Sequence, residues 1–305
     1  MTGITSVEHG ALPQTTPTKA KAASTARFRR RSILSRMPLR SKIALGILAV
    51  IVVIVVAAPL LPLANPIVGD LGSRLLPVGS PGHILGTDSQ GRDMLSRLIY
   101  ATRTSLVAGV VPIIIATVIG IVIGTVAGLG GGIVNTVLMR GIDVLFAFPG
   151  VLLSLLLAIT LGVGLPTLLL ALTLVWIAPV ARIAETEVAR LRDLDYITAA
   201  RSSGAGLPSI LTRQVTPVIL PTVLAYSTSL VGANIAIAGG LGFIGLGVPS
   251  PQPELGAVLQ EMQTALYTDP LLAMLPVIAI LLLSILFPLI GDGIRQAING
   301  RGGDS

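Results

Sequence analysis

Residues 43–61 read IALGILAVIVVIVVAAPLL and contain no charged side chain. At about 1.5 Å of rise per residue, a helix of this length just spans a hydrocarbon core of roughly 30 Å. The apolar run and the basic leader before it are both longer than in a cleaved signal peptide, and Pro59 directly follows the small residues Ala57 and Ala58. We therefore interpret the segment as a retained membrane anchor.

The composition of the whole chain points the same way. Of its 305 residues 52% are hydrophobic and only 11% are charged, with a mean hydropathy of +0.88. A soluble domain has about 25% charged residues, so a chain this poor in charge must have lipid as its main solvent. The 34 glycines suit the close helix contacts that packing in lipid favours. Cysteine is absent, which excludes disulfides and thiolate metal sites.

Uncharged runs predict five further spans, which makes an all-α polytopic membrane protein with six transmembrane helices. The glycine-rich stretch GLGGG (128–132) ends the second span, and GVGLP (162–166) divides an apolar run that is too long for one helix. The further spans are predicted at 104–128, 136–161, 166–181, 216–240 and 271–291. Arg140 and Asp143 stand three residues apart near a helix end, where we expect them to pair.

The distribution of Lys and Arg orients the predicted spans. With both termini inside, the inner side receives 17 of the 21 basic residues, and the outer side receives only Arg74, Arg92, Arg97 and Arg103. We therefore expect cytoplasmic N- and C-termini. The parts of the chain are then a disordered basic cytoplasmic tail (1–40), the first transmembrane helix with an extracytoplasmic loop (41–103), a five-helix core (104–297) with a cytoplasmic loop at 182–215, and a cytoplasmic tail (298–305).

Reactive groups are missing from the predicted spans. His9 and His83, the two histidines, both lie outside them, so an intramembrane protease of the metal or Ser/His type has no base. A proton-coupled secondary carrier normally keeps an acid inside the bundle, and the middles of these spans hold no Asp or Glu. We predict that the chain is not an enzyme and that the energy for any transport comes from outside it.

Two further motifs in the sequence are weak indicators of a binding site. Gly240, Gly242 and Gly245 match G-x-G-x-x-G, but they end an apolar span instead of joining a strand to a helix, so we read them as helix packing or a flexible break. His83 with Asp88 and Asp93 could be taken for a metal site, but one His in a Gly/Pro-rich loop is a poor signal. We predict no metal site.

The polar stretch YITAARSSGAGLPSILTRQVTP (196–217) interrupts two apolar runs on the predicted cytoplasmic side. Asp195 could cap a short helix from Tyr196 to Ser203, and Gly204 could end it in the left-handed conformation. Ala199 and Ala200 leave one side of that helix without bulk. A partner's groove could close on such a helix, although an ordinary interfacial helix joining two spans would look the same.

Three motifs then resemble one family in the right order. HILGTDSQGRDMLSRLIYATRTSL (83–106) resembles the H-P-L-G-T-D-x-x-G-R-D-x-x-S-R motif of the C-type permease subunits in dipeptide/oligopeptide importers of the ATP-binding-cassette class, with Ile84 in place of Pro. LGFIGLGVPSPQPELGAVL (241–259) resembles L-G-F-L-G-L-G-x-x-P-P-x-P-E-W-G, with Leu255 in place of Trp. IGDGIRQA (290–297) resembles G-D-G-L-R-D-A.

The resemblance implies a type-1 importer permease fold in a bacterial inner (plasma) membrane. It implies four kinds of partner: a second homologous permease, two ATPase subunits that carry the ATP and Mg, an extracytoplasmic substrate-binding protein, and membrane lipid. Nucleic acid is not among them, and the chain itself would bind no cofactor. Peptides are the implied cargo, with nickel, glutathione or another small solute as the alternative.

The resemblance also implies two sets of site residues. Thr198 stands where the family's coupling loop E-A-A-x-x-x-G has Glu. The ATPase-coupling residues are expected to be Asp195, Tyr196, Ala199, Ala200, Arg201, Gly204, Ala205 and Pro217. Segments 62–103 and 247–270, polar and rich in Pro, are expected to be exposed to solvent and to face the binding protein. The residues expected in that role are His83, Gly86, Thr87, Asp88, Gly91, Arg92 and Asp93.

Overall fold

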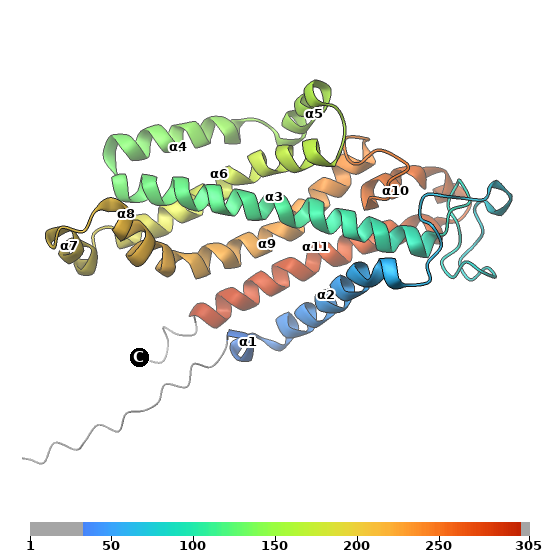
Figure 1. Ribbon diagram of the computed structural model, residues 1–305, viewed down its shortest axis with the longest axis horizontal. Coiled ribbons are helices and arrows are strands. Elements are labelled where there is room, and N and C mark those ends of the chain that lie inside the picture. Colours follow the sequence, from blue (N-terminus) through green and yellow to red (C-terminus); the bar gives the residue numbers. More distant parts are fainter. Residues whose placement is uncertain (1–32, 300–305) are drawn as a thin grey trace, which may run out of the picture. The chain divides into compact units, whose positions relative to one another are not determined.

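The computed structural model describes residues 33–299, which are almost entirely helical and contain no β-strand in that range (Figure 1). The elements in chain order are α1 (Ile33–Arg36), α2 (Leu39–Ala57), η1 (Ala58–Leu60), η2 (Leu71–Ser73), α3 (Met94–Gly130), α4 (Gly132–Ala147), α5 (Gly150–Leu161), α6 (Leu165–Leu191), α7 (Asp195–Ser202), α8 (Leu207–Ile210), η3 (Leu211–Val215), α9 (Thr216–Phe243), α10 (Leu255–Glu261), η4 (Gln263–Tyr267) and α11 (Pro270–Asn299). The N-terminal tail up to residue 32 and the C-terminal residues 300–305 lie outside the described part.

The described helices confirm the predicted all-α membrane architecture. Five segments are long and apolar enough to cross a membrane, and the pair α4 and α5 makes a sixth if the two count as one span. We had expected one continuous helix over 136–161, and this was wrong, because the pair bends by 80° between its halves. Pro149 explains the break, since a proline disfavours a helical conformation in the residue before it, and Phe148 is extended.

The helices are longer than the uncharged runs suggested. α3 begins at Met94 because the side chain of Asp93 accepts a hydrogen bond from the backbone N–H of Ser96 and caps the helix. α6 continues past the predicted end at residue 181 to Leu191, so its last turns carry charged side chains. Hydropathy marks the part of a helix that lies in lipid, and it does not mark where the helix ends.

Close contact between α3 and α6 forms the centre of the bundle. Gly120, Gly124 and Gly128 lie four residues apart on α3, and each faces α6 so closely that a Cβ atom would meet the backbone or side chains of α6. Val180 and Ala184 are among the completely buried residues on the α6 side of this contact. Small residues let two helices in lipid gain van der Waals contact along their backbones, which is what stabilises this pair.

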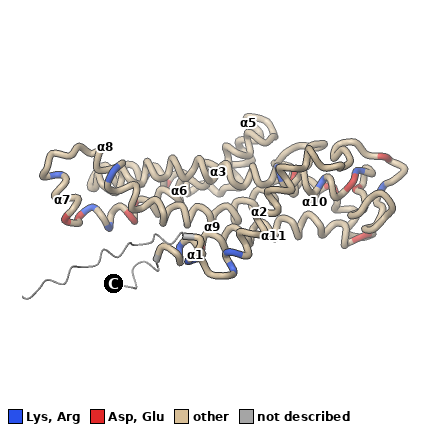
Figure 2. The backbone as a smooth tube through the Cα atoms, turned by 60° about the horizontal axis from the view of Figure 1, so that its bottom comes forward, with Lys and Arg blue, Asp and Glu red and all other residues tan. Residues whose placement is uncertain are grey.

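The remaining long helices pack around this pair. α9 packs along α3 and α6, α11 packs along α9, and α2 lies against α11 (Figure 1). Charged residues gather towards the two ends of the bundle, around α7 at one end and around α10 and the 62–93 loop at the other (Figure 2). Part of the segment expected as an unstructured tail is ordered, because α1 leads to Met37, which is buried against Leu286 and Ile290 of α11.

Candidate functional site

The short helix α7 lies at one end of the bundle, and it begins one residue earlier than predicted. Asp195 was expected to cap it, and this was wrong: Asp195 is the first helical residue, and the backbone carbonyl of Leu194 accepts from the N–H groups of Ile197 and Thr198. The carboxylate of Asp195 in the first turn still interacts favourably with the helix dipole. Gly204 has the predicted left-handed conformation, with φ of 80°.

One side chain anchors α7 to the bundle. Ile197 is completely buried in a cluster with Val188 of α6 and with Ile210 and Val215, which precede α9. Ala200 and Ala205 pack partly against the same cluster, and the N–H of Ala205 donates to the carbonyl of Ala200, which closes the C-terminal turn.

The outer side of α7 is open to solvent. Tyr196, Thr198, Ala199 and Arg201 are all exposed. Pro217 lies apart from them, as the second residue of α9. The exposed side of α7 therefore combines the small Ala199 with the larger Tyr196 and Arg201, while its buried side packs in a cluster with α6 and with the segment that leads into α9.

A buried ionic cluster lies at the opposite end. The guanidinium of Arg92 contacts Asp88 at 2.6 Å and Glu261 at 2.5 Å, and that of Arg97 contacts the same two carboxylates at 3.1 Å and 2.6 Å. Asp88, Arg92 and Arg97 are completely buried. The cluster joins the 62–93 loop and α3 to the end of α10. Glu261, which carries two of these contacts, was not predicted, because nothing near it in the sequence marks it as a partner for residues more than 160 positions away.

The expected exposure of the GTDSQGRD loop (86–93) was therefore wrong for most of the residues we named. Only His83 is partly exposed, and its Nδ1 lies 3.0 Å from the carboxylate of Asp93. The others are buried within the chain: Gly86, Thr87, Asp88, Gly91, Arg92 and Asp93. The loop is polar because its side chains bond to one another, so polarity did not mean solvent contact here. Asp88 faces the two arginines, and in residues 33–299 no three potential metal ligands converge.

Of the three glycines in the G-x-G-x-x-G match, Gly242 serves helix packing, whereas Gly240 is exposed and has open space beside it. Gly242 lies directly against the carboxylate of Glu254, and Gly245 has φ of 84° at the end of α9. Glu254 is completely buried and caps α10 by accepting hydrogen bonds from the N–H groups of Gly256 and Ala257, both at 3.0 Å. The hydroxyl of Ser105 also donates to it, at 2.9 Å. The motif and the acid together hold α9, α10 and α3 in contact.

Glu254 predicts a pH dependence of stability. Burial raises its pKa, and the hydrogen bonds from Gly256, Ala257 and Ser105 oppose the rise only in part. Since its pKa is higher in the folded than in the unfolded chain, its contribution to stability is fully present below the ordinary Glu pKa and is lost as the pH rises through the folded value. We expect the apparent melting temperature of the wild type, relative to that of Glu254→Gln, to fall as the pH rises. A difference that stays constant over roughly pH 4 to 8 would contradict this.

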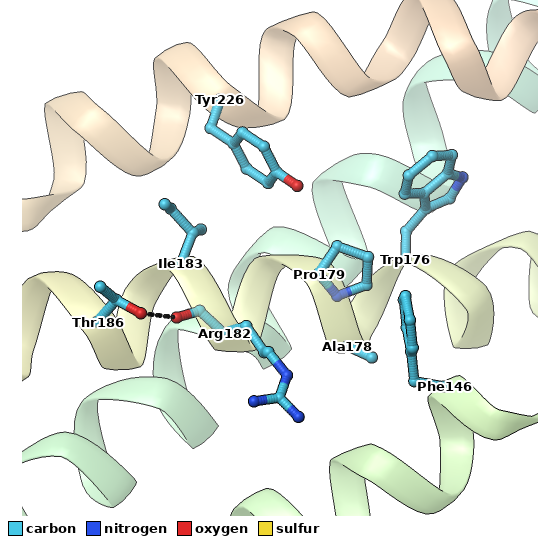
Figure 3. A pocket seen from close by; sticks show the side chains of 8 residues that line it. All are labelled: Phe146, Trp176, Ala178, Pro179, Arg182, Ile183, Thr186 and Tyr226. Carbon is cyan, nitrogen blue, oxygen red and sulfur yellow. Dashed lines mark hydrogen bonds between the residues drawn. The ribbon is translucent and has the colours of Figure 1, made fainter.

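A groove of about 530 Å³ runs along α6 between α4 and α9 (Figure 3). We call it the α6 groove; α6 supplies Trp176, Pro179 and Arg182, α9 supplies Tyr226 and α4 supplies Phe146. We had expected Arg140 to pair with Asp143, and this was wrong, because the carboxylate of Asp143 is bonded to Arg182. The partner comes from the facing helix instead of from the next turn of the same one.

A bundle of apolar helices, with an exposed short helix at one end and a closed polar loop structure at the other, defines a polytopic membrane protein. Residues 120–301 match the family described as the binding-protein-dependent transport system inner membrane component, and the chain belongs to that family. It is a permease subunit of an ATP-binding-cassette importer and a multi-pass inner membrane protein that works with ATPase and substrate-binding components.

Named relatives agree with this assignment. A glutathione transport system permease protein of Pectobacterium atrosepticum is 35% identical over 73% of this chain and 74% of its own length. The corresponding protein of Shigella flexneri is 39% identical over 72% of each chain. A solved structure of the MetNI methionine ABC transporter in an inward-facing conformation has a chain with a TM-score of 0.55, at 18% identity, covering 67% of this chain and 97% of its own. At that identity the structural likeness shows the fold alone.

Proposed function

We propose that this chain forms half of a translocation pathway for short peptides, with a second, homologous permease as the other half. Two ATPase subunits bind the ATP and Mg and carry out the hydrolysis, and one of them binds to α7. An extracytoplasmic binding protein delivers the cargo at the opposite end of the bundle. Both termini then lie in the cytoplasm, in keeping with the predicted distribution of basic residues.

The proposed ATPase contact is supported by the difference between the exposed and the buried side of α7. Its exposed face has the small side chain of Ala199, while Ile197 on its buried face contacts residues of α6 and of the segment that leads into α9. A partner that moves α7 therefore moves two spans with it. ATP binding would draw the two ATPases together and tilt the helices from an inward-open to an outward-open state, which is alternating access by rigid-body motion.

Most of the residues predicted to face the binding protein are buried, so we place this contact on other residues of the same two segments, 62–103 and 247–270. Val68, Leu71 and Ile84 are 67%, 71% and 70% exposed, and Tyr267 in η4 is 93% exposed. Large apolar side chains in solvent are typical of a surface that a partner covers. The buried cluster of Asp88, Arg92, Arg97 and Glu261 then acts as the scaffold for this surface.

The cargo follows from the relatives. Those named above are glutathione permeases, and glutathione is itself a small peptide, so a peptide or glutathione fits better than nickel. In the described spans no potential metal ligands cluster that would favour an ion as cargo.

The proposal is tested by reconstituting the chain with its second permease, ATPases and binding protein in liposomes. We expect ATP-dependent uptake of labelled glutathione or trialanine that requires the binding protein. Uptake by this chain alone would contradict the proposal and indicate a secondary carrier.

A variant tests the proposed docking surface. Tyr267→Asp is expected to lower binding-protein-stimulated ATP hydrolysis about tenfold, because it places a charge in an apolar interface, a loss of about 1.4 kcal/mol. Tyr267→Phe keeps the apolar ring and should behave as wild type. Equal activity of the Asp and Phe variants would remove Tyr267 from the contact.

A further inference from the structure

The α6 groove brings one cation, Arg182, together with aromatic side chains from three helices. The side chain of Arg182 is 56% exposed, and Arg182 is the first charged residue of α6 after the uncharged run that ends at Ala181. A charged side chain at the end of an apolar run turns towards water, because its desolvation by lipid is costly. The groove beside Arg182 is therefore best explained as a space that water or a polar solute fills.

Arg182 has hydrogen-bonding capacity to spare. A guanidinium carries five N–H donors in a planar fork that matches a carboxylate. One of its nitrogens, Nη2, donates to Asp143, and no other side-chain acceptor among residues 33–299 takes a hydrogen bond from this group. Asp143 is itself 37% exposed, so this ion pair is open to exchange. An incoming carboxylate could accept hydrogen bonds from the remaining N–H groups of the guanidinium, or it could displace the carboxylate of Asp143.

The rest of the groove is mainly apolar, with the hydroxyl groups of Thr186 and Tyr226 as its other polar groups, and it is partly rigid. The indole N–H of Trp176 donates to the side-chain oxygen of Asn234 at 2.8 Å, and the amide of Asn234 donates to the backbone carbonyls of Ala108 and Gly109 on α3. This network fixes the Trp176 ring at one end of the groove, with Pro179 between it and Arg182 (Figure 3). Tyr226 extends over the groove from α9 on the other side (Figure 3).

We infer that the α6 groove is a contact site for the transported solute and that Arg182 binds its carboxylate, while Trp176 and Tyr226 contact its apolar part. The inference rests on the proposed function and deepens it, because it names side chains of the pathway and a chemical class of cargo: small anionic or zwitterionic solutes with a free carboxylate. The exchangeable pair with Asp143 keeps the contact weak, as a transport pathway requires, since the solute must also leave.

The test uses the full reconstituted complex with labelled glutathione and trialanine as probes. Arg182→Gln should lower the uptake of both about tenfold, because a charge-assisted bidentate contact is lost. ATP hydrolysis stimulated by the binding protein should stay within about twofold of wild type, because neither α7 nor the opposite end changes. Arg182→Lys keeps the charge without the fork and should restore part of the uptake.

Two control variants separate solute binding from a structural role. Asp143→Asn breaks the same ion pair but leaves the guanidinium free, so uptake should equal or exceed that of the wild type. Arg190→Gln removes a cation from the same helix, one that pairs with Glu187 and does not line the groove, and should have no effect. If Asp143→Asn and Arg182→Gln lower uptake equally, Arg182 acts by joining α4 to α6 and the inference is overturned.

Failure of the inference and failure of the proposed function can be told apart. Normal wild-type uptake that Arg182→Gln leaves unchanged overturns the inference alone, and a lipid chain or water then fills the groove. A wild-type complex that hydrolyses ATP and imports neither probe overturns the proposed cargo and the inference together.

Discussion

Replacing Ala199 by Glu should detach the ATPase subunits from this chain. Ala199 is exposed on α7, and a partner's groove that closes on its methyl group would have to bury a carboxylate instead. Burying an unpaired charge costs several kcal/mol, so we expect the ATPases recovered by co-purification to fall at least about tenfold, with ATP-driven uptake lost in parallel. Because Ala199 makes no core contact, the chain itself should remain folded.

The matched control is Thr198→Glu. It adds the same charge to the neighbouring exposed position. It also introduces the Glu that the dipeptide/oligopeptide permeases carry in their E-A-A-x-x-x-G loop. We expect it to retain the ATPases, and a gain in their recovery would show that the contact of the family's Glu can be rebuilt here. If the Ala199 variant retains its ATPases as well as the Thr198 variant, α7 is an ordinary connecting helix.

Replacing Asp88 by Asn should destabilise the chain by about 3–5 kcal/mol, the usual cost of removing one partner from a buried ion pair. Asp88 faces the guanidinium groups of both Arg92 and Arg97, so its loss leaves two buried cations with Glu261 as their counter-charge. The carboxylate also accepts hydrogen bonds from the backbone N–H groups of Gln90 and Arg92. The measurement is the apparent melting temperature of the solubilised protein.

Asp70→Asn is the control in the same loop. The Asp70 side chain accepts a hydrogen bond from the N–H of Gly72, but it is exposed, so we expect a loss of no more than about 1 kcal/mol. A loss for the Asp88 variant as small as that for the Asp70 variant would mean that water enters the cluster and solvates the two arginines.

The sequence predicted the positions of the short motifs in the chain more accurately than it predicted the environment of their side chains. The left-handed Gly204 follows from glycine's lack of a Cβ atom, which is a local property, and the structure confirms it. The burial of Arg92 and Arg97 is not local, because both depend on Glu261 in a different helix. Polar residues in a Gly/Pro-rich segment look the same in a sequence whether they face water or one another.

The site residues also divide into those whose position follows from local sequence and those whose position depends on other helices. Ala199, Arg201 and Tyr196 were predicted on an exposed helix and lie on one. Arg182 falls at the start of the predicted cytoplasmic loop (182–215), yet it lies in α6 and lines a groove with Tyr226 and Phe146. No spacing rule connects these three residues, because each comes from a different helix.

The sequence alone determined that this is a helical membrane protein, because a long uncharged segment leaves lipid as the only solvent in which its side chains are favourable. It also determined the approximate positions of five of the spans and of α7, while α4 and α5 make a sixth span only if they count as one. Only the tertiary structure decided the ion-pair partners, the burial of the 86–93 loop and the α6 groove. The physical reason is range: solvation and backbone preference act on each segment separately, whereas hydrogen bonds, ion pairs and cavities depend on which helices lie side by side.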